Sequence, residues 1–434
     1  MPDSPRDGRS FWTALLFVAT VAFYWISTRP FVDLSLPSSI DPNADNSSFL
    51  NQVAAIGIFV ALLAAVWNSS LRQSLFQPRA LLVAIFAWYA LSSVLSAYPE
   101  LALKKLVLAA MIVVNAGALL LLPRSDRQFG KLFGLGVLAT LALCYYGVVF
   151  LPTLSIHQAT ELREPMNAGL WRGTFMQKNS AAAAMVIAVF VGLYAMRTWS
   201  RLAGLVIVAA AVFFLVHTGG KTSSAVLPAI LVATWGFERW KWLRAPLAWG
   251  GVAAFNLLAV GSAVFRPLAN FVASLGIDAT FTNRADIWRF AFGAIAHKPI
   301  TGYGFQSFWQ TDSLVYGGGQ VETWAVEAFN GHNAYLDTLL TAGAPGLLLT
   351  VIWLLVLPLK DIARAEAAGN DPALSRLFTR IWLYSIFSSC VESTFFANGD
   401  VVWFSMLMAV IGLRLQARAR LVSEPAPGAE PAYA

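Results

Sequence analysis

Apolar runs of about 20 residues recur along almost the whole chain. Of all its sequence features, these runs restrict the possible folds of the chain most strongly. A helix of that length crosses a hydrocarbon layer of roughly 30 Å. We predict spans near 11–28, 50–68, 78–97, 102–122, 130–151, 179–196, 202–217, 222–237, 247–265, 343–359, 377–396 and 400–416. The pattern therefore indicates an all-α polytopic membrane protein of about 12 transmembrane helices.

Composition agrees with a membrane solvent. Of the 434 residues, 58% are hydrophobic and 12% are charged, against roughly 45–50% and about 25% in soluble domains. The net charge of +7 lies in short clusters between apolar runs, which fits lipid headgroups and not nucleic acid. Cys144 and Cys390 fall inside apolar runs without CxxC spacing, so we interpret them as packing residues.

The distribution of basic residues predicts the orientation. Arg6 and Arg9 precede the run Phe11–Ile26 without a small-residue cleavage pattern, so we expect a retained first helix, not a signal peptide. With both termini cytoplasmic, every inner connection carries positive charge, as the positive-inside rule requires. These inner residues are Arg6, Arg9, Arg72, Arg79, Arg124, Arg127, Lys131, Arg197, Arg201, Arg239, Lys241, Arg244, Lys360, Arg364, Arg376, Arg380, Arg414, Arg418 and Arg420.

The connections divide the chain into four parts. We expect a membrane domain of nine helices over 1–265, a long periplasmic loop with short helices over 266–342, and a membrane domain of three helices over 343–420. The tail 421–434, rich in Pro and Ala, reads as a disordered cytoplasmic segment. The loops 152–178 and 266–342 exceed the usual connection length, which favours a functional role.

The remaining basic residues lie at the predicted outer face, where the positive-inside rule disfavours them. Arginine offers phosphate oxygens a bidentate fork and lysine a point charge, so a pyrophosphate is the natural ligand. For any one of them, the alternative is a side chain that snorkels to lipid headgroups. They are Arg29, Lys104, Lys105, Arg163, Arg172, Lys178, Lys221, Arg266, Arg284, Arg289 and Lys298.

The segment 171–180 is the first of three that sharpen this prediction. A glycine turn at Gly173 and a polar cluster containing Lys178 and Asn179 precede four alanines that open a helix. The N–H groups and positive dipole end of such a helix can bind an anion. Simple capping by Asn179 or Ser180 explains the pattern equally well.

The second segment, 217–224, superficially resembles a phosphate-binding P-loop. That motif needs a glycine five residues before Gly220, where the chain has Leu215, and a preceding strand that a membrane helix cannot supply. We therefore exclude nucleotide binding here. The segment predicts a tight outer turn that places Lys221 at the mouth of two helices, either as a site residue or as a headgroup anchor.

The third segment contains a predicted helix whose start is marked by Asn283, with Asp286 three residues on. Its apolar residues Ile287, Phe290, Ala291, Ala294 and Ile295 repeat at helical spacing. This pattern is typical of an amphipathic helix lying on the outer membrane surface. Arg284 would then sit at the depth of a phosphate.

His332 follows an Asn330-Gly331 turn, and Asn333 can cap a helix Ala334–Thr341 that ends at Gly343 and Pro345. The positive end of that helix favours the neutral imidazole that a general base needs. The alternative is an ordinary polar surface histidine. Glu322 and Glu327 could each orient the ring, and the spacing favours neither.

Four motifs resemble the O-antigen ligase and polymerase superfamily of bacterial inner-membrane glycan enzymes. They are Gly173-Thr174-Phe175-Met176-Gln177-Lys178-Asn179, Gly219-Gly220-Lys221-Thr222-Ser223, Arg284-Ala285-Asp286-Ile287-Trp288 running on to Gly302-Tyr303-Gly304-Phe305, and His332-Asn333-Ala334-Tyr335-Leu336-Asp337 with Gly343-Ala344-Pro345-Gly346. The Lys178-Asn179 pair is most similar to the exopolysaccharide-polymerase branch.

The resemblance implies a GT-C-like fold and a metal-independent, inverting glycosyl transfer without cofactors. The donor would be an undecaprenyl-pyrophosphate-linked glycan, and the acceptor a glycan or the lipid A core, on the periplasmic side of the inner membrane. It assigns Lys221 and Arg284 to the pyrophosphate and His332 to catalysis, with Arg172, Lys178, Asn179 and Asn333 as further substrate-binding candidates. The family commonly has arginine where this chain has Lys221, for which Arg172 or Lys178 could compensate.

A transporter or flippase of lipid-linked saccharides is the rival prediction, because it also needs cations for pyrophosphate. A transporter should place charges along a path at mid-membrane depth, whereas the outer charges here gather at one face. That distribution favours the enzyme. A purely structural scaffold would leave the outer basic residues unexplained.

Overall fold

The computed structural model describes residues 5–26, 29–36, 49–276, 284–315, 324–370 and 372–418. Asn283, Glu322 and the predicted tail 421–434 lie outside these residues. Within the described ranges the regular structure is helical, apart from one isolated antiparallel bridge between Ile156 and Trp171. The all-helical part of the predicted fold class is confirmed.

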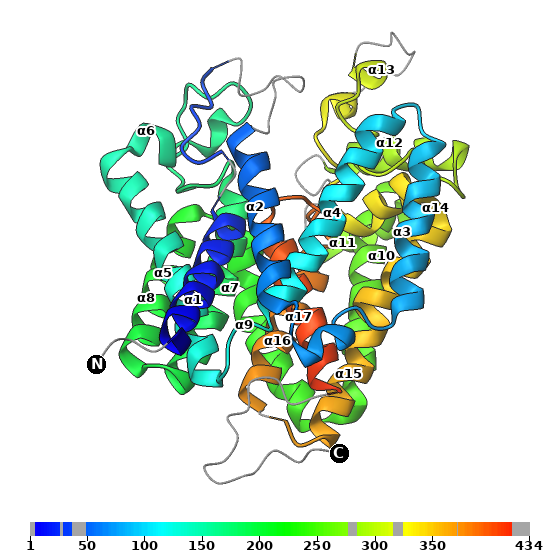
Figure 1. Cartoon of the computed structure of the whole chain (residues 1–434). Helices are drawn as coiled ribbons and strands as arrows, with labels where there is room; N and C mark the ends of the chain where they lie inside the picture. Colours follow the sequence, from blue (N-terminus) through cyan, green and yellow to red (C-terminus); the bar gives the residue numbers. More distant parts are fainter. Residues whose placement is uncertain are drawn as a thin grey trace.

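The helices form one bundle, and the start of α1 and the end of α17 lie at the same end of it (Figure 1). In chain order they are α1 (Pro5–Trp25), α2 (Phe49–Val66), α3 (Arg79–Val94), α4 (Pro99–Leu119), α5 (Asp126–Phe150), α6 (Pro152–Ser155), α7 (Lys178–Thr198), α8 (Arg201–Thr218), α9 (Lys221–Arg239), α10 (Gly251–Val264), α11 (Arg266–Ser274), α12 (Arg284–His297), α13 (Asp312–Val315), α14 (Ala334–Val351), α15 (Leu357–Ala367), α16 (Pro372–Ser388) and α17 (Val401–Gln416).

Six helical segments of the described residues are long and apolar enough to cross a membrane. They are 99–119, 126–150, 178–198, 201–218, 241–264 and 334–367, and shorter apolar helices cover 11–25, 50–66, 79–94 and 401–416. A polytopic helical membrane protein is therefore confirmed. The count of 12 spans and the GT-C-like arrangement stay predictions.

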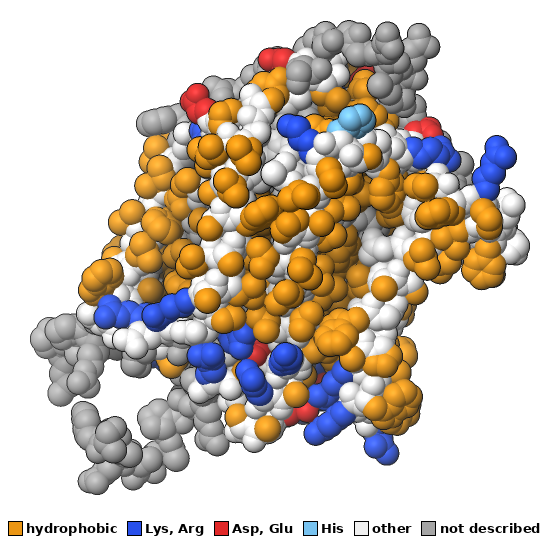
Figure 2. Space-filling model, turned by 90° about the vertical axis from the view of Figure 1, so that its right-hand side faces the viewer, with side chains coloured by type: hydrophobic (Ala, Val, Ile, Leu, Met, Phe, Trp, Pro, Cys, Tyr) orange, Lys and Arg blue, Asp and Glu red, His pale blue; other side chains and the backbone are white. Residues whose placement is uncertain are grey.

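The outer surface of the bundle matches this assignment. Figure 2 shows a broad band of hydrophobic side chains, with Lys and Arg gathered along its lower edge and a smaller group of basic side chains beside a histidine above it. Such a band between two polar zones is what a bilayer requires of a spanning protein. The compartment that each zone faces stays a prediction.

Helix α7 is the most buried of the candidate spans, with 72% of its apolar window inside the protein. Small residues bring its neighbour α8 close: a Cβ atom at Gly204 would lie 2.5 Å from the carbonyl oxygen of Gly192. Close approach through small residues is the usual way in which membrane helices pack. The N-terminus of α7, with Lys178, is therefore held on a rigid element.

Helix α16 ends at Ser388, although the hydropathy pattern predicted a span over 377–396. Residues 389–400 form turns, in which Phe396 has φ 57° and Gly399 has φ 81°. The predicted end is wrong because polar residues after Ser388 bind partners outside a helix: Ser389 Oγ lies 2.5 Å from Thr394 Oγ1, and Glu392 binds Arg284. We call residues 389–400 the α16–α17 loop.

Helix α14 begins at Ala334 as predicted and breaks at Gly343, whose φ of 66° and ψ of −173° are not helical. The chain resumes the helix and continues through a π-helical segment, Ile352–Val356, into α15. The predicted stop at Gly343 is thus a kink inside a long span.

Helix α12 covers the residues where an amphipathic helix was predicted. Its apolar side, including Ile287, Ala291 and Ile295, is buried against α10, α14 and a 3₁₀ turn at Trp324–Glu327. This side packs on protein, so the predicted placement of the stripe on the membrane surface is wrong. The packing fixes the position of Arg284 at the first residue of the helix.

Candidate functional site

The predicted site residues lie at the start of four helices. Lys178 opens α7, Lys221 opens α9, Arg284 opens α12, and His332 lies two residues before α14. Helix N-termini present unpaired N–H groups and the positive end of the helix dipole. The four elements therefore carry positive charge and hydrogen-bond donors at these ends, and three of them contact the α16–α17 loop.

Glu392 of the α16–α17 loop connects three of these elements. Its Oε1 atom accepts from Arg284 Nη2 at 2.9 Å and from Asn179 Nδ2 at 3.4 Å. Its Oε2 atom lies 3.4 Å from Nδ1 of His332. Arg284 Nη1 also donates to the backbone carbonyl of Val391. One carboxylate thus contacts the predicted base, the predicted pyrophosphate-binding arginine and the first turn of α7.

The charges around Glu392 determine its ionisation. Burial alone would raise its pKa, but the His332 contact and the Arg284 guanidinium outweigh burial and lower the pKa to about 2. The side chain remains 32% exposed, and those of Arg284 and His332 are 17% and 27% exposed. Glu392 is therefore ionised at neutral pH, and the three side chains are partly exposed. We call Glu392, Arg284, His332 and Asn179 the Glu392 cluster.

Two lysines extend the positive region. Lys178 is close enough to both Lys221 and Glu392 for their charges to act on it, and the Lys221 side chain is exposed. The backbone N–H of Lys178 donates to His157 Nε2 at 3.2 Å, and His157 Nδ1 binds Glu161 Oε2 at 2.7 Å. This buried pair anchors the loop before α7 and holds its first turn in place.

The described hydrogen bonds of Asn333 stabilise the fold around the start of α14. Asn333 is fully buried, caps α14 by accepting from Leu336 N at 2.8 Å, and donates to Asn256 Oδ1 and to the carbonyl of Cys390. The predicted cap is confirmed.

Arg172 is also fully buried and donates to the carbonyls of Phe175 and Val32. Burial lowers the pKa of Arg172, while the nearby carboxylates of Glu161 and Asp33 oppose that shift. Its described contacts stabilise the loop 152–177 and do not join it to the Glu392 cluster.

Sequence reasoning missed Glu392 because it fell inside a predicted span. An acidic residue within an apolar run was the available signal, since intramembrane charges are usually functional. The sequence offered Glu322 and Glu327 as residues that could orient the His332 ring, and Glu322 lies outside the described residues. Glu327 is exposed, and its charge acts on Arg163.

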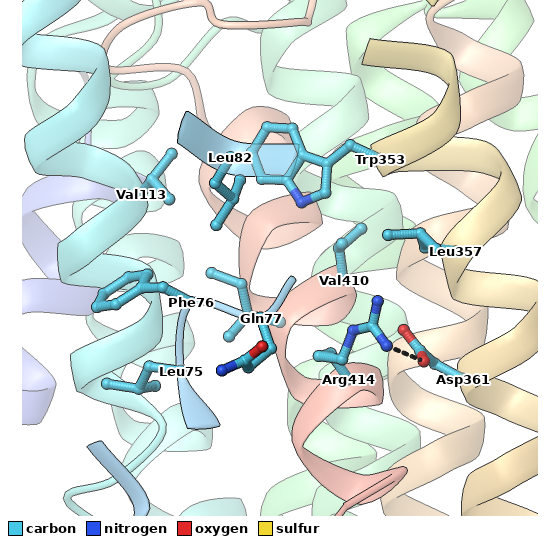
Figure 3. A pocket seen from close by; sticks show the side chains of 11 residues that line it. Leu75, Phe76, Gln77, Leu82, Val113, Trp353, Leu357, Asp361, Val410 and Arg414 are labelled. Atoms are coloured by element: carbon cyan, nitrogen blue, oxygen red, sulfur yellow. Dashed lines mark ion pairs between the residues drawn. The ribbon is translucent and has the colours of Figure 1, made fainter. Parts of the chain in front are cut away.

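Figure 3 shows a cavity that none of the residues of the Glu392 cluster lines. Hydrophobic side chains such as Phe76 and Trp353 line it together with Asp361 and Arg414, which form an ion pair at 3.0 Å. The predicted site residues are not among its lining, and its charges already neutralise each other. We therefore place the candidate site at the Glu392 cluster. Within the described part of the chain, no group of three or more His, Cys, Asp and Glu side chains could hold a metal ion.

Comparison with known proteins agrees with the motifs. Residues 186–351 match a family model described as O-antigen ligase, a range that includes Lys221, Arg284 and His332. The exopolysaccharide production protein ExoQ of Rhizobium meliloti (strain 1021) is 26% identical over 136 residues, which cover 30% of this chain and 29% of that relative. The chain therefore matches less than a third of the relative's length. These matches confirm the resemblance to the O-antigen ligase and polymerase superfamily.

Proposed function

Because residues 186–351 match the O-antigen ligase family, we propose that this protein is a glycosyltransferase of surface polysaccharide assembly. It moves glycan from an undecaprenyl-pyrophosphate carrier to an acceptor hydroxyl at the periplasmic side of the inner membrane. The observation that carries the proposal is the contact of His332 with Glu392 beside Arg284. A candidate base and candidate anion-binding groups thus share one carboxylate.

The donor's pyrophosphate binds to Arg284, Lys221 and Lys178. Arg284 supplies a fork that matches phosphate oxygens, and the two lysines supply point charges. The positive dipole ends at the starts of α7 and α9 attract an anion in the same way. Arg284 binds Glu392 and the Val391 carbonyl, so phosphate oxygens would meet a guanidinium that is already oriented.

His332 acts as the general base. With its proton on Nδ1 facing Glu392, the ring keeps Nε2 free to accept the proton of the acceptor hydroxyl. The acceptor oxygen then bonds to the anomeric carbon of the donor sugar as the bond to the pyrophosphate oxygen breaks. A single displacement inverts the configuration at that carbon. Arg284, Lys221 and Lys178 stabilise the departing pyrophosphate, so the reaction needs no metal ion.

The proposed activity has two forms, polymerase and ligase, which differ in the acceptor. A second lipid-linked repeat unit makes the protein a polymerase, and the lipid A core makes it a ligase. The Lys178-Asn179 pair and the partial similarity to an exopolysaccharide production protein support the polymerase. Deletion tests this choice: loss of long polymer with retained single units supports a polymerase, and full-length unattached polymer supports a ligase.

A reconstituted assay tests the transfer itself. Purified wild-type protein in detergent, given lipid-linked donor and acceptor, should produce longer or newly attached glycan, and His332→Gln protein should not. Detergent removes the two compartments that a flippase needs, so product formation separates the enzyme from a transporter. Absence of product in detergent, together with movement of donor lipid across the bilayer of sealed vesicles, would overturn the proposal.

A further inference from the structure

The carboxylate of Asp337 joins the two segments that carry His332 and Glu392. Asp337 lies in the first turn of α14. Its Oδ1 atom accepts from the backbone N–H of Gly331 at 3.0 Å and from Trp309 Nε1 at 2.8 Å. Its Oδ2 atom accepts from the hydroxyl of Ser393. Gly331 directly precedes His332, and Ser393 directly follows Glu392.

The backbone at His332 needs such support. His332 has φ 46°, in the left-handed region that side-chain-bearing residues rarely adopt, and it persists only when surrounding contacts determine it. Three bonds fix this turn: Gly331 N to Asp337, His332 N to Asn330 Oδ1 at 2.9 Å, and Trp288 Nε1 to the Gly331 carbonyl at 2.8 Å. Asp337 is the member of this set that reaches the turn from α14.

Gly331 is shaped for the same contact. A Cβ atom at position 331 would lie 2.5 Å from Asp337 Oδ1, too close for any larger residue without displacement. The absence of a side chain lets the carboxylate reach the Gly331 N–H. The turn and the carboxylate are therefore matched in shape as well as in hydrogen bonding.

We propose that Asp337 is a positioning residue that sets the separation and orientation of His332 and Glu392. This inference rests on the proposed function, in which His332 is the base and Glu392 orients it. Asp337 acts through its hydrogen bonds with Gly331, Trp309 and Ser393. This role requires no contact between Asp337 and the substrate. A misplacement of a reacting group by about 1 Å can cost on the order of 10²-fold in rate.

The first test compares Asp337→Ala, Asp337→Asn and Thr338→Val in the purified full-length protein. Thr338 follows Asp337 on α14 and binds the carbonyl of Ala334, so Thr338→Val removes a neighbouring buried hydrogen bond as a matched control. Asp337→Ala should lower turnover by roughly 10²-fold with unchanged donor affinity. Asp337→Asn should recover part of the loss, because an amide oxygen still accepts from Gly331 and an amide N–H can donate to Ser393. Equal turnover for Asp337→Ala and Thr338→Val would overturn the proposal.

The second test is a double-mutant cycle that separates positioning from general damage. If Asp337 acts through His332, Asp337→Asn should lower turnover in the wild-type background and cause no further loss in a His332→Gln background. An equal loss in both backgrounds contradicts the positioning role while leaving the proposed function intact. Wild-type turnover by His332→Gln alone contradicts the proposed base, and so the two failures are distinguishable.

Discussion

His332 and Glu392 lie 60 residues apart in the chain, and Nδ1 of the histidine is 3.4 Å from Oε2 of the glutamate. The glutamate's second oxygen binds Arg284 at 2.9 Å. This arrangement couples the orientation of the proposed base, His332, to the position of the proposed phosphate-binding residue, Arg284. Each of the following predictions tests one part of it.

Removing the imidazole should abolish most of the activity. We expect His332→Ala and His332→Gln to lower turnover by roughly 10²–10⁴-fold, the usual contribution of a positioned base, while donor lipid still binds. Turnover and donor binding are measured on purified protein, with EDTA added in a parallel sample. Normal turnover by His332→Gln, or loss of activity in EDTA, would contradict the mechanism.

Arg284→Ala should nearly abolish transfer through loss of donor binding, because the guanidinium provides two charge-assisted hydrogen bonds to phosphate. Arg289→Ala is the matched control on the same helix. Its guanidinium pairs with Asp286 at 2.6 Å and is 56% exposed, and we expect near-normal transfer. Donor affinity measured on both variants decides the assignment. If both variants bind donor equally well, Arg284 is only a structural anchor.

Lys221→Arg should keep or raise donor affinity, since arginine adds a bidentate fork at the same place. Lys221→Ala should weaken donor binding. Lys298 provides a control lysine: it follows the last residue of α12, about 20 Å along the helix from Arg284, and lies over the ring of Tyr303 at 5.0 Å. Lys298→Ala should bind donor normally, and an equal loss in both alanine variants would indicate a nonspecific charge effect.

Glu392→Gln should reduce both turnover and stability. Arg284 and His332 lower the pKa of Glu392 from its ordinary value of 4.5 to about 2. A lowered carboxyl pKa contributes stability above pH 4.5, and that contribution is lost as the pH falls toward 2. The difference in Tm between wild type and Glu392→Gln should therefore shrink as the pH falls below 4.5. A difference that stays the same as the pH falls from 5 toward 2 would refute the ionised carboxylate.

Asp312→Cys should react with an impermeant thiol reagent in intact cells, because α13 is predicted to be periplasmic. Arg364→Cys in α15 should react only after lysis. Both positions are exposed, and the native Cys144 and Cys390 are buried, so unmodified protein serves as the background. Labelling in the reverse order would place the proposed site in the wrong compartment.

Local sequence signals determined the helical membrane fold, the start of α14 and the position of α12. The apolar runs are long enough to require helices in a membrane, because an unpaired backbone is too costly there. Asn333 caps α14, and an amphipathic repeat places α12, since both patterns act over one or two helical turns. The sequence motifs also identified His332, Arg284 and Lys221 as candidates.

Tertiary structure alone decided how those candidates meet. The bond between Arg284 and Glu392 joins residues 108 positions apart, and the bond between Asn179 and Glu392 joins residues 213 positions apart. Hydropathy placed Glu392 inside a helix because it counts apolar residues, and it cannot detect partners from distant segments. The same reason explains why the sequence did not predict the surroundings of Arg172. One of the carbonyl groups that it binds belongs to Val32, which lies 140 positions away in the chain. Helix length and capping depend on neighbours in sequence, whereas the site depends on which helix ends are packed together.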